Sequence, residues 1–261
     1  FKNKPVPVQF SWLGYCNNTY IDEIDYMVVD ENVIEHKNNL NTDNVIKMPK
    51  IWNSLSKLDD VRVNELPFIG KNTFNFGCFN NFLKISEDTI EIWSKILSKI
   101  PNSNLVLKSS VSADKNYKKY LIKKFKNKIE ENRIIILNYE KNKRKHLEQY
   151  LNIDLGLDTF PYNGVTTTFE SLWMGVPVIT LKGDKFLSRC GYSINKNACL
   201  NEFIANTKEE YISIALNSIS SIGIENLKKL RKNLRSKIIK SPLFNIDDYT
   251  DDFVKQLKKI N

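Results

Sequence analysis

Residues 153–181 read IDLGLDTFPYNGVTTTFESLWMGVPVITL, and this stretch decides the fold of the chain. The apolar run over residues 153–158 is typical of a buried parallel strand. Residues 169–174 have the composition of a helix, which the glycine at position 175 ends. A second apolar run over residues 177–181 reads as another buried strand. The stretch therefore predicts one strand–helix–strand unit of a parallel sheet.

The loop inside this unit is rich in glycine and hydroxyl groups. Pro161, Asn163 and Gly164 favour a tight turn, and Thr166–Thr168 directly precede the helix. In open parallel sheets ligands bind at the carboxyl ends of the strands, and the N–H groups at a helix start attract phosphate. The loop therefore predicts a phosphate site. The alternative is that the three threonines only cap the helix, because threonine is a common cap.

Strand and helix signals alternate along the chain from residue 72 onward. Strands are expected over residues 74–79, 104–108 and 133–137, and a helix capped by Ser86 has its apolar face at Ile90, Trp93, Ile96 and Leu97. Further helices are expected over residues 114–131, 142–150, 185–193, 208–220, 225–240 and 246–260. This alternation predicts an α/β fold with a doubly wound parallel sheet.

The first 66 residues do not read as a complete domain. Three short strand signals lie at residues 6–14, 26–30 and 45–48, and polar turns lie at 16–19 and 35–43. Residues 52–66 show no clear periodicity. Too few helices are present to cover a parallel sheet on both faces, so we expect the end of one lobe followed by a connector. Because the chain begins with Phe1, we also expect it to be an internal piece of a longer protein.

Composition favours a folded domain with a sizeable core, since 41% of the residues are hydrophobic and 26% are charged. The sequence has no apolar run long enough to span a membrane and no signal peptide. The four cysteines are far apart and form no CxxC pair: Cys16, Cys78, Cys190 and Cys199. This usage predicts reduced thiols in a cytoplasmic protein and no metal site.

The net charge of +9 raises the question of nucleic acid as a partner. The lysines are spread over the predicted helices, at residues 115–128, 141–145, 228–240 and 255–259. No zinc finger, KH loop or aromatic RNP pattern accompanies them. We therefore interpret them as solvated helix faces, with a partner surface and a nucleic-acid surface as the weaker alternatives.

Several motifs together resemble the catalytic region of O-GlcNAc transferases and the related SPINDLY proteins, glycosyltransferase family 41, and most closely its bacterial SPINDLY-like branch. They are WLGY at 12–15, IDY at 24–26, FNNFLKI at 79–85, His146, and residues 158–180 with PYNGVTTTFESLWMGVP at 161–177. The resemblance implies a GT-B fold, in which two Rossmann-like lobes bind a nucleotide sugar, mainly through the second lobe and without a metal. Tetratricopeptide repeats usually precede these lobes.

The resemblance also implies a division of the chain. Residues 1–66 would be the end of the first catalytic lobe and the connector, and residues 67–241 the nucleotide-sugar-binding Rossmann-like lobe. Residues 242–261 would form a closing helix that returns to the first lobe. The family's first-lobe histidines and its repeats would precede Phe1. We therefore expect donor binding by this chain, with turnover requiring the missing part.

Lys84 takes the catalytic role in this resemblance. It corresponds to the family lysine on the donor diphosphate, where a cation offsets the charge that builds up on the leaving group. Without the family pattern, Lys84 would read as an ordinary loop lysine.

The other implied donor-binding residues surround the same loop. Asn81 stands where the family often has a phosphate-contacting glutamine, and Thr166 and Thr167 match its phosphate-contacting threonines. Glu170 matches a carboxylate that holds the ribose hydroxyls, and His146 matches a histidine against the nucleobase. The set is completed by Asn163, Gly164 and Thr168 of the loop and by Arg189, a weaker candidate. His36 has no motif around it and is expected at the surface.

One departure leaves the donor open. Val165 stands where O-GlcNAc transferases carry a histidine, so both UDP-GlcNAc and GDP-fucose fit the motifs. We expect the donor-binding part of a protein O-glycosyltransferase that transfers GlcNAc or fucose to Ser/Thr of a protein acceptor. It would use no cofactor beyond the nucleotide-sugar substrate. The alternative is a non-catalytic nucleotide-sugar-binding or scaffold module that pairs with another chain or domain.

Overall fold

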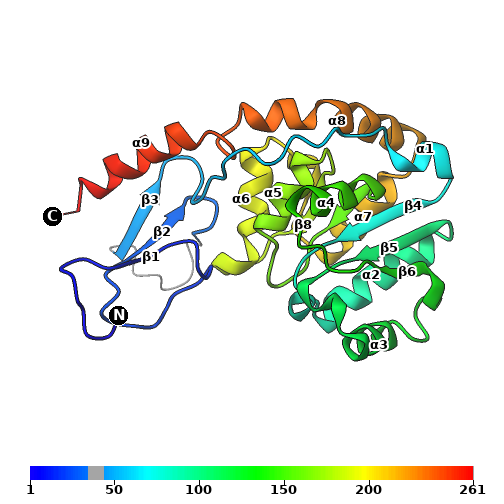
Figure 1. The fold of residues 1–261 in the computed structure, drawn as a ribbon, viewed down its shortest axis with the longest axis horizontal. Helices are drawn as coiled ribbons and strands as arrows, with labels where there is room; N and C mark the ends of the chain where they lie inside the picture. The colour runs from blue at the N-terminus through cyan, green and yellow to red at the C-terminus, as the bar shows by residue number, and fades with distance from the viewer. Residues whose placement is uncertain (35–43, 261) are drawn as a thin grey trace.

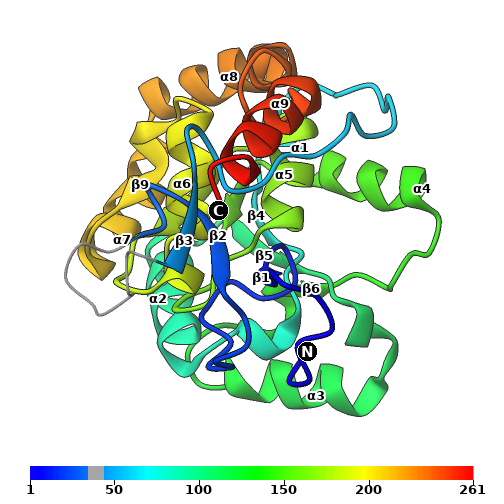
Figure 2. The same ribbon diagram turned by 90° about the vertical axis from the view of Figure 1, so that its left-hand side faces the viewer.

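The computed structural model describes residues 1–34 and 44–260 of the chain. It contains a large and a small parallel sheet with helices packed around them (Figures 1 and 2). The turn predicted over residues 35–43 and the surface position expected for His36 lie outside the described residues. Within the described residues, no helix is long and apolar enough to cross a lipid bilayer.

The large sheet has six parallel strands in the order β6-β5-β4-β7-β8-β9. They are β4 (Phe74–Cys78), β5 (Ser103–Leu107), β6 (Ile134–Ile136), β7 (Leu155–Leu157), β8 (Val178–Leu181) and β9 (Ile204–Ala205). The chain moves outward from β4 to β6, returns to β7 beside β4, and then moves outward in the other direction. The strand order thus reverses between β4 and β7, which is where doubly wound sheets bind ligands.

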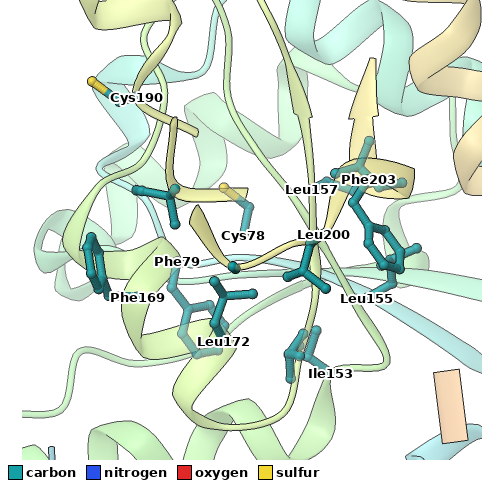
Figure 3. Close-up of a cluster of buried hydrophobic side chains, with 14 of the residues drawn as sticks. Cys78, Phe79, Ile153, Leu155, Leu157, Phe169, Leu172, Cys190, Leu200 and Phe203 are labelled. Atoms are coloured by element: carbon teal, nitrogen blue, oxygen red, sulfur yellow. The ribbon is translucent and has the colours of Figure 1, made fainter. Parts of the chain in front are cut away.

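Helices cover this sheet and bury the apolar faces that the sequence periodicity indicates. They are α1 (Pro67–Lys71), α2 (Glu87–Lys99), α3 (Lys115–Lys124), α4 (Lys143–Glu148), α5 (Thr166–Trp173), α6 (Cys190–Asn197), α7 (Lys208–Asn217) and α8 (Ser221–Ile239). Ser86 caps α2, as predicted, by accepting a 3.1 Å hydrogen bond from the Thr89 N–H. Figure 3 shows part of the core, with Phe169 and Leu172 of α5 and Leu155 and Leu157 of β7, all of them buried.

Three local predictions were wrong in extent. The helix expected over residues 114–131 ends at Lys124, because Asn127 adopts a left-handed φ of 66°, which asparagine tolerates and a continuing helix does not. The strand expected over residues 6–14 is only β1 (Phe10–Ser11), and Leu13 also has a positive φ. The helix expected over 185–193 is divided into a short 3-10 turn, Phe186–Ser188, and α6.

The threonines do not cap α5, which removes the alternative interpretation of the loop. The N-cap residue is Val165, and no side-chain hydrogen bond caps the helix there. Thr166–Thr168 instead form the first turn of α5 itself, and Gly175 follows the helix with a φ of 73°. None of their hydroxyl groups caps the helix, and the Thr167 hydroxyl donates to the Asn80 side chain instead.

The small sheet contains β1, β2 (Tyr26–Asp30) and β3 (Val45–Met48), and all three strands run parallel. The last helix, α9 (Ile246–Leu257), contacts β3. The Trp12 ring stacks on Phe253 of α9 at 4.9 Å, and its indole N–H and the Tyr249 hydroxyl both donate to the carbonyl of Trp52. The chain end thus packs on the small sheet (Figure 1), while the exact limits of the three expected parts stay a prediction.

Polar contacts join the small sheet and its connector to the large domain. The buried Asp30 carboxylate accepts hydrogen bonds from the Ser193 hydroxyl of α6 at 2.6 Å and from the Trp52 N–H at 2.9 Å. Farther along the connector, the buried Arg231 of α8 donates to the carbonyl of Asn64 at 3.0 Å. The two sheets are therefore held in one arrangement by hydrogen bonds as well as by apolar packing.

Candidate functional site

The site lies at the carboxyl ends of β4, β5 and β7, where the strand order reverses. Asn80, Lys108 and Asp158 follow these three strands within two residues, and all three are buried. The loop 158–164 and the start of α5 complete the site, so side chains from distant parts of the chain meet at one sheet edge.

The Asp158 carboxylate organises the loop. This side chain is 1% exposed, and it accepts hydrogen bonds from the N–H groups of Gly164 (2.7 Å) and Thr159 (2.9 Å). It also accepts from the Asn80 amide at 3.1 Å and from the Thr180 hydroxyl at 2.9 Å. Burial raises the pKa of Asp158 to about 6, and these hydrogen bonds oppose the rise. The group is therefore an anion at neutral pH and holds four donors.

Asn80 connects the end of β4 to the start of α5. Its amide nitrogen donates to Asp158 and to the Thr159 hydroxyl at 3.1 Å, and its amide oxygen accepts from the Thr167 hydroxyl. At Gly164 a Cβ atom would lie 2.7 Å from the Asn80 side chain and 2.9 Å from Thr167. Glycine is required there by this close approach, and the helix start is consequently fixed against the sheet.

The catalytic candidate Lys84, in the loop after β4, also contacts the loop 158–164. Its ammonium group donates to the Asn163 carbonyl at 2.9 Å and lies 3.7 Å from the centre of the Tyr162 ring. Burial lowers the pKa of Lys84, and the nearby Asp158 carboxylate opposes this. The structure thus places a partly buried cation beside the loop that leads into α5.

The start of α5 presents backbone donors. Thr166 is exposed, Thr167 is half-buried and Thr168 is buried. The N–H groups of Thr168 and Phe169 donate to the Val165 carbonyl, whereas the Thr166 and Thr167 N–H groups form no hydrogen bond with the described residues. With the Lys84 cation nearby, these donors form a place that suits an anion.

His146 of α4 and Glu170 of α5 form a pair. Nε2 of His146 lies 2.9 Å from Oε2 of Glu170, and the Tyr150 hydroxyl lies 3.1 Å from the same oxygen. Nδ1 of His146 contacts the amine of Lys108, which follows β5. Burial lowers the pKa of Lys108 to about 8, and Glu170 opposes this. His146, predicted to contact the nucleobase, and Glu170, predicted to hold the ribose hydroxyls, are therefore in direct contact.

The remaining predicted residues have other partners. Asn81 is exposed, and its side chain accepts from the Leu83 N–H at 3.1 Å. The buried Asn163 side chain donates to the Thr159 carbonyl and accepts from the Gly191 N–H, so it supports the loop from inside. Arg189 donates to the carbonyls of Asn32 at 2.6 Å and Gly183 at 3.2 Å. Arg189 therefore lies at the junction with the small sheet, and its hydrogen bonds do not involve Lys84 or the start of α5.

Sequence reasoning missed the buried polar residues of the site, namely Asn80, Lys108, Tyr150 and Asp158. Asn80 directly follows a predicted strand, and Lys108 and Asp158 are the last residues of two others, so this position at the strand ends was a signal that could have found them. Among residues 1–34 and 44–260 no group of three or more His, Cys, Asp or Glu side chains is arranged to hold a metal ion. The four cysteines are free thiols.

Comparisons with known proteins give consistent matches over nearly the whole chain. The SPINDLY protein of Hordeum vulgare, described as a probable UDP-N-acetylglucosamine–peptide N-acetylglucosaminyltransferase, is 33% identical over 250 residues. The match covers 95% of this chain and 26% of that protein. The SEC protein of Arabidopsis thaliana, which has the same description, is 29% identical over 99% of this chain and 27% of its own length. The chain spans about a quarter of the length of these relatives.

Two solved structures also match the chain. The O-GlcNAc transferase of Thermobaculum terrenum matches with a TM-score of 0.82 and 27% identity, over 99% of this chain and 50% of that one. The Anabaena protein HepE, solved with UDP-glucose, matches at a TM-score of 0.55 and 14% identity over 83% of this chain and 58% of its own, which shows the fold alone. The predicted α/β fold, a Rossmann-like doubly wound lobe of GT-B type, is confirmed.

The family model of glycosyl transferase family 41 matches residues 65–253, which include the large sheet, the loop before α5 and Lys84. The motif resemblance, the fold and the relatives therefore agree, and this chain belongs to glycosyl transferase family 41.

Proposed function

We propose that this chain is the donor-binding part of a protein O-glycosyltransferase. In this proposal a nucleotide sugar binds at the sheet edge, and GlcNAc or fucose is transferred to a Ser/Thr hydroxyl of a protein acceptor. The observation that carries the proposal is the position of the Lys84 ammonium beside the loop that leads into α5, 2.9 Å from the Asn163 carbonyl. The missing first lobe and the repeats of the parent would supply the acceptor side.

The donor diphosphate would lie between Lys84 and the free N–H groups of Thr166 and Thr167. A helix start attracts phosphate through its N–H groups, and a lysine provides a localised positive charge. During transfer the bond between the sugar and the diphosphate breaks, and its electron pair remains on the phosphate oxygen. The Lys84 cation would stabilise this developing charge, which is electrostatic catalysis without a metal.

The nucleoside would lie along α5 toward His146 and Glu170. Both described hydrogen bonds of the Glu170 carboxylate end on Oε2, so its other oxygen is a suitable acceptor for ribose hydroxyls. The His146 side chain is 19% exposed and offers a ring surface to a base. Diphosphate and nucleoside would therefore be bound by opposite ends of the first two turns of α5.

The identity of the donor is part of the proposal. The SPINDLY and SEC relatives are described as probable UDP-N-acetylglucosamine–peptide N-acetylglucosaminyltransferases, and this favours UDP-GlcNAc. Val165, at the N-cap of α5, replaces the histidine expected for an O-GlcNAc transferase, and this favours another sugar such as the fucose of GDP-fucose. A transfer assay with both labelled donors decides between them.

The experiment that tests the function uses the full-length parent protein, incubated with labelled UDP-GlcNAc or GDP-fucose and a protein acceptor. We expect label on Ser/Thr from one donor and a loss of about 100-fold or more in Lys84→Ala. The exposed Lys119→Ala, on α3, is the matched control and should retain activity. A parent that binds donor but transfers neither sugar would support the non-catalytic module instead.

A further inference from the structure

Lys108 is a buried lysine for which the donor site so far has no role. It follows β5 directly, the residue is 2% exposed, and its ammonium lies 5.2 Å from the centre of the Phe79 ring. Its hydrogen-bond partner among the described residues is Nδ1 of His146, and no carboxylate of that part of the chain forms an ion pair with it. Burying a lysine without an ion pair is costly, so its position calls for a reason.

The contact with Lys108 fixes the proton arrangement of His146. A lysine ammonium has donors only, so Nδ1 of His146 must accept with its lone pair. The ring proton then lies on Nε2, which faces the Glu170 carboxylate at 2.9 Å, and a carboxylate is an acceptor. The opposite tautomer would place two lone pairs against each other at the His146–Glu170 contact.

The Nε2–H group of His146 in turn orients the Glu170 carboxylate. Its Oε2 atom faces Nε2 of His146 and, at 3.1 Å, the hydroxyl of the buried Tyr150, which lies slightly farther, at 3.3 Å, from the Thr167 carbonyl. The Tyr150 ring is itself packed at 4.3 Å against Phe79 and at 5.8 Å against the His146 ring. One carboxylate oxygen is thus held by two donors from two elements, and the direction of the other oxygen is set.

We propose that Lys108 is a positioning residue for the donor nucleoside: it holds His146 in the Nε2–H tautomer and thereby aims Glu170 at the ribose hydroxyls. This inference rests on the proposed donor site. Lys108 acts through His146, and Lys84 with the start of α5 binds the phosphates separately. Loss of Lys108 therefore weakens binding of the nucleoside part and leaves binding of a bare diphosphate unchanged.

The first test needs no variant. The chain has two histidines, so ¹⁵N NMR with a His36→Gln variant for assignment identifies the His146 ring signals. At pH 7 we expect a protonated Nε2 and an unprotonated Nδ1. In Lys108→Met the Nδ1 atom should become protonated in part of the molecules, whereas Lys108→Arg, which remains a donor, should keep the original tautomer. An Nδ1–H tautomer in the unmodified chain would overturn the proposal.

The second test separates a positioning role from a structural one. Calorimetry measures the affinity of the chain for UDP, GDP and inorganic pyrophosphate. Lys108→Met should bind the preferred nucleoside diphosphate about tenfold more weakly and pyrophosphate equally well, with Lys108→Arg restoring the affinity. In a His146→Ala background, Lys108→Met should cause no further loss.

The outcomes are distinguishable. Equal losses for nucleoside diphosphate and pyrophosphate, or additive losses in the double variant, would show that Lys108 only supports the fold and would overturn the inference. Should Lys108→Met fail to fold, His146→Ala must still lose nucleoside diphosphate affinity and keep that for pyrophosphate. An unmodified chain that binds none of the three ligands would overturn the donor site itself, and the role of Lys108 with it.

Discussion

The ammonium group of Lys84 donates a 2.9 Å hydrogen bond to the carbonyl oxygen of Asn163, which lies 79 residues farther along the chain. This bond joins the loop after β4 to the loop before α5. It places a positive charge close to the start of α5, where the Thr166 and Thr167 N–H groups have no hydrogen-bond partner in the described part of the chain. The charge and the helix start together define the expected phosphate end of the site.

Lys84→Ala should therefore weaken binding of the phosphate part of the donor only. A hydrogen bond to a charged group contributes about 1.5–3 kcal/mol, so the affinity for a nucleoside diphosphate should fall about tenfold or more. The affinity for the corresponding nucleoside without phosphates should not change. Calorimetry on this chain measures both, and an equal loss for the two ligands would contradict the assignment of Lys84 to the phosphates.

Asp158→Ala should destabilise the fold strongly. The carboxylate accepts four hydrogen bonds in the interior, and its removal leaves the N–H groups of Gly164 and Thr159 buried without a partner. We expect a loss of about 3–5 kcal/mol in the free energy of unfolding, measured with urea. The exposed Asp184→Ala should change it by less than about 0.5 kcal/mol, and equal effects of the two would refute the role of Asp158.

Gly164→Ala tests the close approach between the loop and β4. The new methyl group would lie 2.7 Å from the Asn80 side chain, so Asn80 must move away from Asp158 and Thr167. We expect a cost of about 1–3 kcal/mol in stability and weaker nucleotide binding. Gly70→Ala is the control, because nothing lies within 4 Å of its added Cβ. Normal binding by Gly164→Ala would contradict the proposed contact between loop and ligand.

The pKa of Lys108 gives a dependence of stability on pH. Burial lowers it to about 8, below the value of about 10.4 for an exposed lysine. Between these values the unfolded chain binds more protons, so the contribution of Lys108 to the free energy of unfolding rises with pH. The free energy of unfolding of the unmodified chain, minus that of Lys108→Met, should therefore rise from pH 7.5 to 9.5. A difference that is constant or falls would show that burial does not lower the pKa of Lys108.

Much of the fold could be predicted because short segments decide it. The cap at Ser86, the apolar run of β7 and the stop at Gly175 are local signals, and each is found where the sequence indicates it. The orientation of the small sheet could not be predicted in this way. Its strands pair in parallel, and the packing of Trp12 on α9 joins residues more than two hundred positions apart.

The site could be predicted only in part, for the same reason. The motif around Thr166 and Glu170 is contiguous, whereas the contact of Lys108 with His146 depends on how β5 and α4 meet. The position of Arg189 depends on Asn32, 157 residues away in the sequence, and on the place of the small sheet. Tertiary contacts of this kind leave no local pattern, although the position of a polar residue after a strand is a usable indication.

The central claim is that this chain carries the nucleotide-sugar site. Calorimetric titration of the unmodified chain with UDP, GDP, UDP-GlcNAc and GDP-fucose tests it most directly. We predict binding of one nucleotide class, with the matching sugar donor binding at the same site and in competition with the free diphosphate. Absence of binding by all four ligands, in a chain shown to be folded, would contradict the account.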